Sequence, residues 1–267
     1  MPSLGEIKRK QQQTWSSGDY SKVAWITQPL AEVVCEEVDL RPGSRVLDVA
    51  TGTGHVALAA ARRFCEATGL DYVPALLEVG RQRAAAEGLR VEFVEGDAED
   101  LPFPDDTFDY VLSAIGVMFA PDQPKAASEL LRVCRPGGTV GVLSWQPKGY
   151  LGELFALIGR YVPPPPELRP AALWGTEERV RELFGTGASQ LSFRQGAHTH
   201  RFPSVDHYVD FFLSYYGPTH KAAQALDAKS RESFAADIAA LVGRYNRARN
   251  GAAVWPVDYL LAIAVKA

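Results

Sequence analysis

Two closely spaced glycines follow a short apolar stretch near residue 50, a pattern typical of a ligand-binding turn. Residues 46–50 predict a buried strand, Gly52 and Gly54 come next, and residues 56–64 have the apolar spacing of a helix. Glycine allows tight-turn backbone conformations and lets a ligand approach closely. The start of the following helix adds unpaired N–H groups and partial positive charge. The pattern predicts a ligand site at the carboxyl end of a parallel strand.

Two cofactor classes fit such a turn. Residues 52–57 match the dinucleotide fingerprint G-x-G-x-x-G/A, and Asp71 follows at a suitable distance. Asp48 is not part of that fingerprint, and a negative charge beside the turn suits an ammonium group better than a pyrophosphate. Asp71 ends a predicted second strand, where a carboxylate can accept both hydroxyls of a ribose. The alternative role for Asp71 is to cap a helix predicted over residues 74–87.

Three stretches carry a resemblance to one family. The stretch VLDVATGTG (46–54) resembles motif I of the class I S-adenosylmethionine (SAM) dependent methyltransferases, although that family usually has glycine where this chain has Ala50. The stretches GDAEDLPFPDDTFDYVLS (96–113) and ELLRVCRPGGTVGVLSW (129–145) resemble the next motifs, in the same order. The resemblance covers about residues 40–146. Within the family, the chain resembles the broad group that includes ubiquinone and menaquinone C-methyltransferases and many natural-product O-, N- and C-methyltransferases.

This resemblance implies a fold, a cofactor and a site. The expected fold is α/β, with a doubly wound, mostly parallel seven-stranded sheet and a helical insert before the last strand, in one domain spanning residues 1–267. The implied cofactor is SAM, which leaves as S-adenosylhomocysteine. Asp97 is expected to accept the adenine amino group, and the backbone N–H of Ala98 to contact the ring. The full set of implied cofactor-binding residues is Asp48, Ala50, Thr51, Gly52, Gly54, Asp71, Tyr72, Asp97, Ala98 and Ser113.

Alternating strand and helix patterns set out the rest of the chain. Further strands are predicted over residues 65–71, 91–97, 108–113, 139–145, 189–202 and 259–266. Helices are predicted over residues 4–15, 30–38, 124–133, 149–161, 176–184, 204–216 and 222–249. The last two strands are expected to run antiparallel at one sheet edge, with the helical insert over residues 203–255 between them.

The acceptor pocket is expected between the glycine turn, an N-terminal arm or lid (residues 1–28) and the helical insert. Aromatic residues from both segments could line it: Trp15, Tyr20, Tyr215 and Tyr216. Packing into the core is the alternative role for these rings. Among the five histidines, His198 and His200 alternate on one strand face, but no third metal ligand is evident. No metal site is therefore predicted, and no catalytic residue is named.

Composition narrows the class of protein. The chain has 46% hydrophobic residues, and 28 lysines and arginines stand against 32 acidic residues without a long basic run. These features fit a folded protein and argue against a nucleic-acid partner. No signal-peptide core or membrane-spanning stretch is apparent, which predicts a cytoplasmic protein. Cysteines 35, 65 and 134 are expected to be buried thiols. The oligomeric state stays open, with a homodimer as one option.

The leading hypothesis is a SAM-dependent methyltransferase acting on a small organic acceptor, in quinone or secondary metabolism, at an oxygen, nitrogen or carbon atom. The alternatives are a tRNA or protein methyltransferase and a nonenzymatic SAM-binding regulator. The hypothesis of an NAD-dependent oxidoreductase ranks last, because it does not explain the sequence of residues 97–103.

Overall fold

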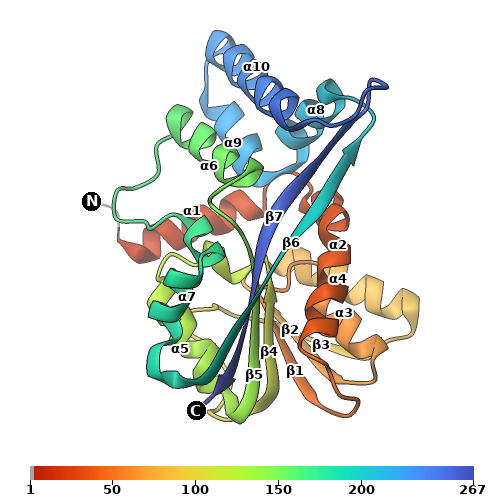
Figure 1. Cartoon of the computed structure of the whole chain (residues 1–267), viewed down its shortest axis with the longest axis vertical. Coiled ribbons are helices and arrows are strands. Elements are labelled where there is room, and N and C mark those ends of the chain that lie inside the picture. The colour runs from red at the N-terminus through yellow and green to blue at the C-terminus, as the bar shows by residue number, and fades with distance from the viewer. Residues whose placement is uncertain (1–2) are drawn as a thin grey trace.

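A seven-stranded sheet runs through the centre of the computed structural model, which describes residues 3–267 (Figure 1). The strand order is β3-β2-β1-β4-β5-β7-β6. Strands β1 to β5 pair in parallel, and β7 pairs antiparallel with both β5 and β6. The strands are β1 (Arg45–Val49), β2 (Glu66–Asp71), β3 (Val91–Glu95), β4 (Phe108–Ala114), β5 (Cys134–Trp145), β6 (Ala188–Phe202) and β7 (Ala253–Lys266). The predicted fold class is confirmed.

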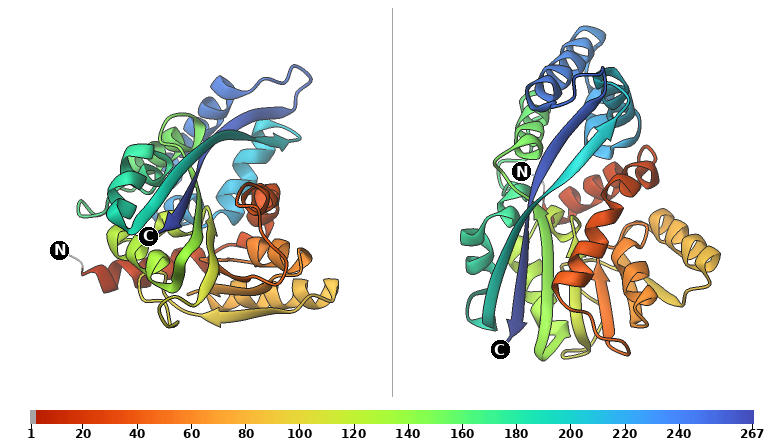
Figure 2. Two further views of the ribbon diagram at one scale, coloured as in Figure 1. Left: turned by 60° about the horizontal axis from the view of Figure 1, so that its bottom comes forward. Right: turned by 45° about the vertical axis from the view of Figure 1, so that its right-hand side comes forward.

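Helices cover both faces of this sheet, as Figures 1 and 2 show. On one side lie α2 (Tyr20–Glu37), α3 (His55–Arg62) and α4 (Pro74–Glu87), and on the other α5 (Gln123–Val133) and α7 (Glu177–Phe184). A sheet covered on both faces needs strands that are apolar on both sides. Strand β1 meets this need, since four of its five residues are buried.

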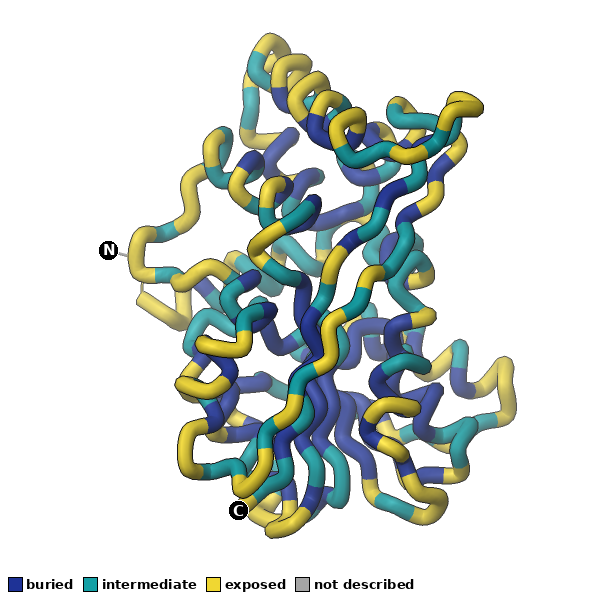
Figure 3. The backbone as a smooth tube through the Cα atoms, viewed as in Figure 1, coloured by how far each residue is buried: buried dark blue, intermediate teal, exposed yellow. Residues whose placement is uncertain are grey.

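Four helices form a cap beyond the carboxyl ends of β1 to β5, and β6 and β7 are long enough to reach into it (Figure 1). They are α6 (Tyr150–Tyr161), α8 (Val205–Tyr215), α9 (Gly217–Ala225) and α10 (Ala228–Tyr245). Trp255 of β7 packs against Tyr150 and Tyr208, with ring centroids 5.1 and 4.9 Å apart. The hydrophobic core therefore continues from the sheet into the cap, as the dark band in Figure 3 shows.

Helix α1 (Leu4–Trp15) lies across the chain between the cap and the sheet (Figure 1). It begins with a capping box, in which the Ser3 hydroxyl accepts from the Glu6 N–H and the Glu6 carboxylate accepts from the Ser3 N–H. The loop after α1 touches α8 closely. A Cβ at Gly18 would lie 2.8 Å from the carbonyl oxygen of Tyr215, and the φ of Gly18 is +71°. Only glycine fits there, so the arm is held against the helical insert.

Most predicted elements are confirmed, and the differences have local causes. The helix predicted over residues 30–38 was too short, because α2 starts at Tyr20 and continues through Pro29. The helix predicted over residues 222–249 is wrong as one element: Asp227 caps a new helix, α10, by accepting from the Ser230 N–H. Strand β7 begins at Ala253, which ends the helical insert at residue 252 rather than 255. Strand β5 starts at Cys134, five residues before the predicted start of that strand at residue 139.

Three further features of residues 3–267 bear on the expectations. None of the described helices combines the length and the apolarity that crossing a membrane requires. All three cysteines are buried free thiols, as predicted. No cluster of metal-ligating side chains occurs among these residues. The first two residues of the predicted arm lie outside the described part of the chain.

Candidate functional site

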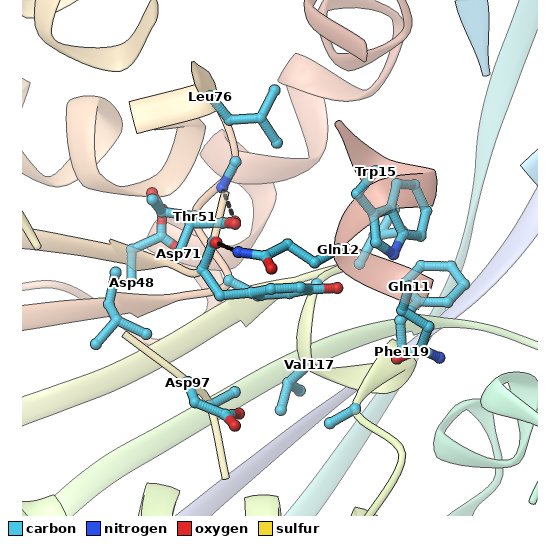
Figure 4. A pocket seen from close by; sticks show the side chains of 18 of the residues that line it. Gln11, Gln12, Trp15, Asp48, Thr51, Asp71, Leu76, Asp97, Val117 and Phe119 are labelled. Carbon is cyan, nitrogen blue, oxygen red and sulfur yellow. Dashed lines mark hydrogen bonds between the residues drawn. The ribbon is translucent and has the colours of Figure 1, made fainter. Parts of the chain in front are cut away.

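A cavity of about 280 Å³ lies where β1, β2, β3 and β4 end, under helix α1. Figure 4 shows that carboxylates gather on one side of it, from Asp48, Asp71 and Asp97, while Trp15 and Phe119 lie on the other. In an open parallel sheet, ligands bind outside the carboxyl ends of the strands. The cavity therefore occupies the position that the glycine pattern predicts.

Asp48 fastens the glycine turn (residues 50–54) to the helix that follows it. One of its carboxylate oxygens accepts the Thr51 hydroxyl at 2.5 Å and the Ala57 N–H at 3.0 Å. Asp48 is only 2% exposed, and this burial raises its pKa to about 7. The carboxylate thus shapes the turn from below and also lines the cavity.

Two predicted site residues support the turn from behind and do not line the cavity. Gly54 has φ +85°, and a Cβ there would lie 2.9 Å from the Phe93 ring, so the position requires glycine. Ser113 is fully buried; its hydroxyl donates to the carbonyl of Val49 and accepts from the N–H of Val117. Both residues position the ends of β1 and β4 rather than face a ligand.

Ala50 lies where the resembled family usually has glycine, and its backbone shows why. Its φ is +54°, in the left-handed region where a Cβ is unfavourable. Ala50 lines the cavity beside Thr51 and Gly52. The chain therefore keeps the turn's conformation despite the methyl group.

Asp71 joins the tip of β2 to the glycine turn. Its two oxygens accept the N–H of Gly52 at 2.8 Å and the N–H of Val73 at 2.9 Å. The alternative role as the cap of α4 is wrong, since the residue at that position is Val73 and makes no side-chain cap. Burial raises the pKa of Asp71 to about 6. An ionised carboxylate has about four acceptor sites, so two remain for a ligand in the cavity.

Asp97 forms an ion pair with Lys8, which the sequence analysis did not predict. Lys8 of α1 lies 2.6 Å from the Asp97 carboxylate and 2.5 Å from that of Glu99. Burial works against the charge of Lys8, but the two carboxylate bonds outweigh it and raise the pKa of Lys8. Ala98, the next predicted residue, also lines the cavity. Helix α1 thus covers the acidic side of the site through an ion pair.

The rest of α1 closes the cavity from above. Gln12 donates to the backbone carbonyl of Tyr72 at 2.5 Å, and Figure 4 marks this bond with the dashed line that starts at the Gln12 side chain. Trp15 packs edge-on against Tyr20 and Phe119, with centroids 5.4 and 4.8 Å apart. Tyr20 lies over the glycine turn, because a Cβ at Gly52 would meet its ring at 3.8 Å. The arm therefore lies over the glycine turn.

Sequence reasoning missed the loop after β4. Ile115 lines the cavity with φ +61°, a strained conformation for a β-branched residue, and a short 3-10 helix, η1 (Val117–Phe119), follows it. No apolar period marks so short an element, and only the strain identifies it as special. His55 also lines the cavity, and its burial and the nearby Arg83 lower its pKa to about 3.

Two of the three tyrosines predicted for the acceptor pocket, Tyr215 and Tyr216, lie in different surroundings. Tyr216 lines a second, small cavity of about 30 Å³ next to the first. Tyr215 lines neither cavity; its ring lies under the Lys22 ammonium at 4.2 Å and against Phe211. Helix α8 ends at Tyr215, and the backbone of Tyr216 is extended (φ −84°, ψ 110°), so the two side chains do not share a helical direction and only Tyr216 lines a cavity.

Comparisons with known proteins agree with this geometry. A family model described as a methyltransferase domain matches residues 46–138. An uncharacterized protein of Mycobacterium tuberculosis is 44% identical over 211 residues, which cover 78% of this chain and 77% of that protein. A demethylmenaquinone methyltransferase of Thermus thermophilus is 44% identical over 124 residues, covering 45% of this chain and 56% of that protein. The solved structure of Haemonchus contortus phosphoethanolamine N-methyltransferase 2, in complex with phosphomonomethylethanolamine and S-adenosylhomocysteine, aligns with a TM-score of 0.61. It is 18% identical and covers 100% of this chain and 60% of that chain, a likeness of fold.

Proposed function

Because the chain belongs to the class I SAM-dependent methyltransferases, we propose that it methylates a small organic acceptor bound between the glycine turn and helix α1. One observation carries this proposal. The cavity has carboxylates on one side and aromatic rings on the other, and it is covered by the arm rather than open to a large partner. Small-molecule sites combine apolar walls with a few placed polar groups in this way.

The carboxylate side would hold the cofactor. We assign the ribose hydroxyls to Asp71, the adenine to Asp97 and Ala98, and the ammonium end to the turn above Asp48, with Ala50, Thr51, Gly52 and Tyr72 completing the wall. The ion pair of Lys8 with Asp97 would then have to share that carboxylate with the adenine amino group. Gly54 and Ser113 hold the turn in shape without touching the ligand.

The residues of this chain would position the acceptor and exclude water from the site. SAM supplies a methyl group already activated by its positive sulfur. The chain must align the acceptor with that methyl group and exclude water. Trp15, Tyr20 and Phe119 cover the aromatic side of the cavity and perform the second task. We therefore propose that residues 1–28 act as a lid and that the helical insert completes the acceptor pocket.

Methylation assays test this proposal directly. The purified protein, SAM and a panel of phenols, hydroxyquinones, amines and carboxylic acids are combined, and release of S-adenosylhomocysteine and product mass are measured. Quinone and secondary metabolites form the first panel, and bulk tRNA and protein form the last. Methylation of at least one small acceptor is expected, and methylation confined to tRNA or protein would refute the proposal.

Calorimetry tests the cofactor assignment separately. We expect S-adenosylhomocysteine to bind with a Kd in the micromolar range and NAD to show no measurable heat. Tighter binding of NAD would contradict the assignment of the glycine turn.

A further inference from the structure

The small cavity adjoins the large one through a shared aromatic wall. Five residues line both cavities: Trp15, Tyr20, Thr27, Ile115 and Phe119. The volume of the small cavity, about 30 Å³, suits a single water-sized group. Three of these five residues are aromatic, so the rings of Trp15, Tyr20 and Phe119 form much of the boundary between the two cavities.

His200 is a buried residue that lines the small cavity. It comes from β6 and is 3% exposed. Neither of its ring nitrogens has a hydrogen-bond partner among residues 3–267. Buried polar groups are almost always hydrogen-bonded, and each exception calls for an explanation. The unpaired imidazole therefore points to a missing ligand group.

The residues around the small cavity limit the chemical type of the group that could bind His200. Among the described residues, none with an acidic side chain, a lysine or an arginine lines it. The ring of Trp145 packs edge-on against His200 at 6.4 Å, and Phe212 lies at 6.5 Å. Burial lowers the pKa of His200 to about 3, so the ring is neutral and offers one donor and one acceptor. Such a site suits a neutral hydroxyl better than an ammonium or carboxylate group, since burying a charge without a counter-charge is costly.

We propose that His200 recognises the acceptor by accepting a hydrogen bond from its phenolic hydroxyl. This inference rests on the proposed function and names the acceptor class, a flat aromatic alcohol. The acceptor ring would occupy the large cavity beside Ile115 and Phe119, and its hydroxyl would enter the small cavity. Tyr20 and Tyr216 line the same space and would flank the hydroxyl.

Binding of three matched probes tests this assignment without turnover. 2-Naphthol, 2-methoxynaphthalene and naphthalene are titrated into the full chain saturated with S-adenosylhomocysteine. Imidazole nitrogen resonances are followed by NMR, and the His200→Gln variant identifies the signal of His200. We expect 2-naphthol to bind roughly tenfold tighter than its methyl ether, the scale of one buried hydrogen bond, and to move that signal.

Variants supply the controls. His200→Phe should lose the hydroxyl preference while its Kd for S-adenosylhomocysteine changes less than about twofold, and its melting temperature should not fall, because an unpaired buried imidazole is replaced by a ring of similar size. His198→Gln is the matched control, since His198 lies on the same strand face but lines neither cavity. It should keep the preference. His200→Gln keeps a donor and an acceptor and should keep part of it.

Several results would overturn the inference. These are equal binding of 2-naphthol and its ether to the wild-type chain, no binding of any probe, or a hydroxyl preference that survives in His200→Phe. If His200→Phe does not fold, a His200→Gln variant that keeps the full preference for 2-naphthol over its ether counts against the inference in the same way. Methyl transfer to some other acceptor in any of these cases would leave the proposed function standing, so the two failures are distinguishable.

Discussion

Changing Asp48 to asparagine removes a charge from beneath the glycine turn while keeping an oxygen in place. Asp48 is 2% exposed, and its Oδ2 accepts from both Thr51 and Ala57. The asparagine oxygen can accept the same two hydrogen bonds. The substitution therefore tests the cost of the buried charge more than the loss of the turn's hydrogen bonds.

The expected size of the stability effect follows from the pKa of Asp48. Burial raises the pKa of Asp48 from 3.8 to about 7. One pKa unit corresponds to about 1.4 kcal/mol, so the charged form costs up to about 4 kcal/mol in the folded state. The folded chain holds this proton more tightly than the unfolded chain. This contribution to the free energy of unfolding is therefore full below about pH 4 and is lost as the pH rises through about 7.

Urea unfolding of the ligand-free protein between pH 4 and pH 8 measures this effect. Relative to wild type, Asp48→Asn should gain about 2–4 kcal/mol in the free energy of unfolding as the pH rises across this range. Its affinity for S-adenosylhomocysteine should instead fall by about 1.5–3 kcal/mol, the scale for a lost charged partner. The buried charge would thus destabilise the free protein and serve the ligand.

Asp109 provides the control of opposite sign. Burial opposes its charge, but a bond from Arg135 at 2.6 Å and one from the Arg45 N–H at 2.8 Å outweigh it and lower the pKa of Asp109. The contribution of a depressed pKa is present above the unfolded value of 3.8 and is lost only as the pH falls below it. The stability difference between wild type and Asp109→Asn should therefore stay nearly constant from pH 4 to pH 8 and shrink on acidification below pH 4. A stability difference between wild type and Asp48→Asn that stays constant from pH 4 to pH 8 would refute the reasoning.

Three further predictions concern the same site. Asp71→Ala should weaken S-adenosylhomocysteine binding by about 1.5–3 kcal/mol in calorimetry. It should also lower the free energy of unfolding of the ligand-free protein by about 1–2 kcal/mol, because the N–H groups of Gly52 and Val73 lose their acceptor. Unchanged affinity would show that Asp71 does not bind the ribose. Ala50→Gly should raise the free energy of unfolding by about 0.5–1 kcal/mol, as relief of a left-handed Cβ exceeds the added chain entropy, and a loss in urea unfolding would count against strain at this turn. Deleting residues 1–20 should leave a folded chain by circular dichroism that binds S-adenosylhomocysteine more weakly and transfers no methyl group; full activity would exclude the lid.

Local patterns in the sequence were enough to predict the glycine turn and the order of most elements. Side chains alternate along a strand and recur every three to four residues along a helix, so burial leaves a readable period in each segment. Cap and turn residues act over a few positions, which explains why the helices over 4–15 and 74–87 were predicted to the residue. The joined helix over 222–249 failed because its break depends on Asp227, whose capping role the periodic pattern does not reveal.

Contacts between distant segments decided the rest. The ion pair of Lys8 with Asp97 joins residues 89 apart, and the bond from Gln12 to Tyr72 joins residues 60 apart. His200 and Trp145 come from strands separated by β7. Only the tertiary packing buries His200 at a cavity without a hydrogen-bond partner in the part of the chain that the structure describes. The sequence by itself determined which chemical groups the chain carries and which local structures present them. Which of those groups meet depended on how the sheet and its covering helices pack, because residue spacing carries no information about neighbours brought together across the fold.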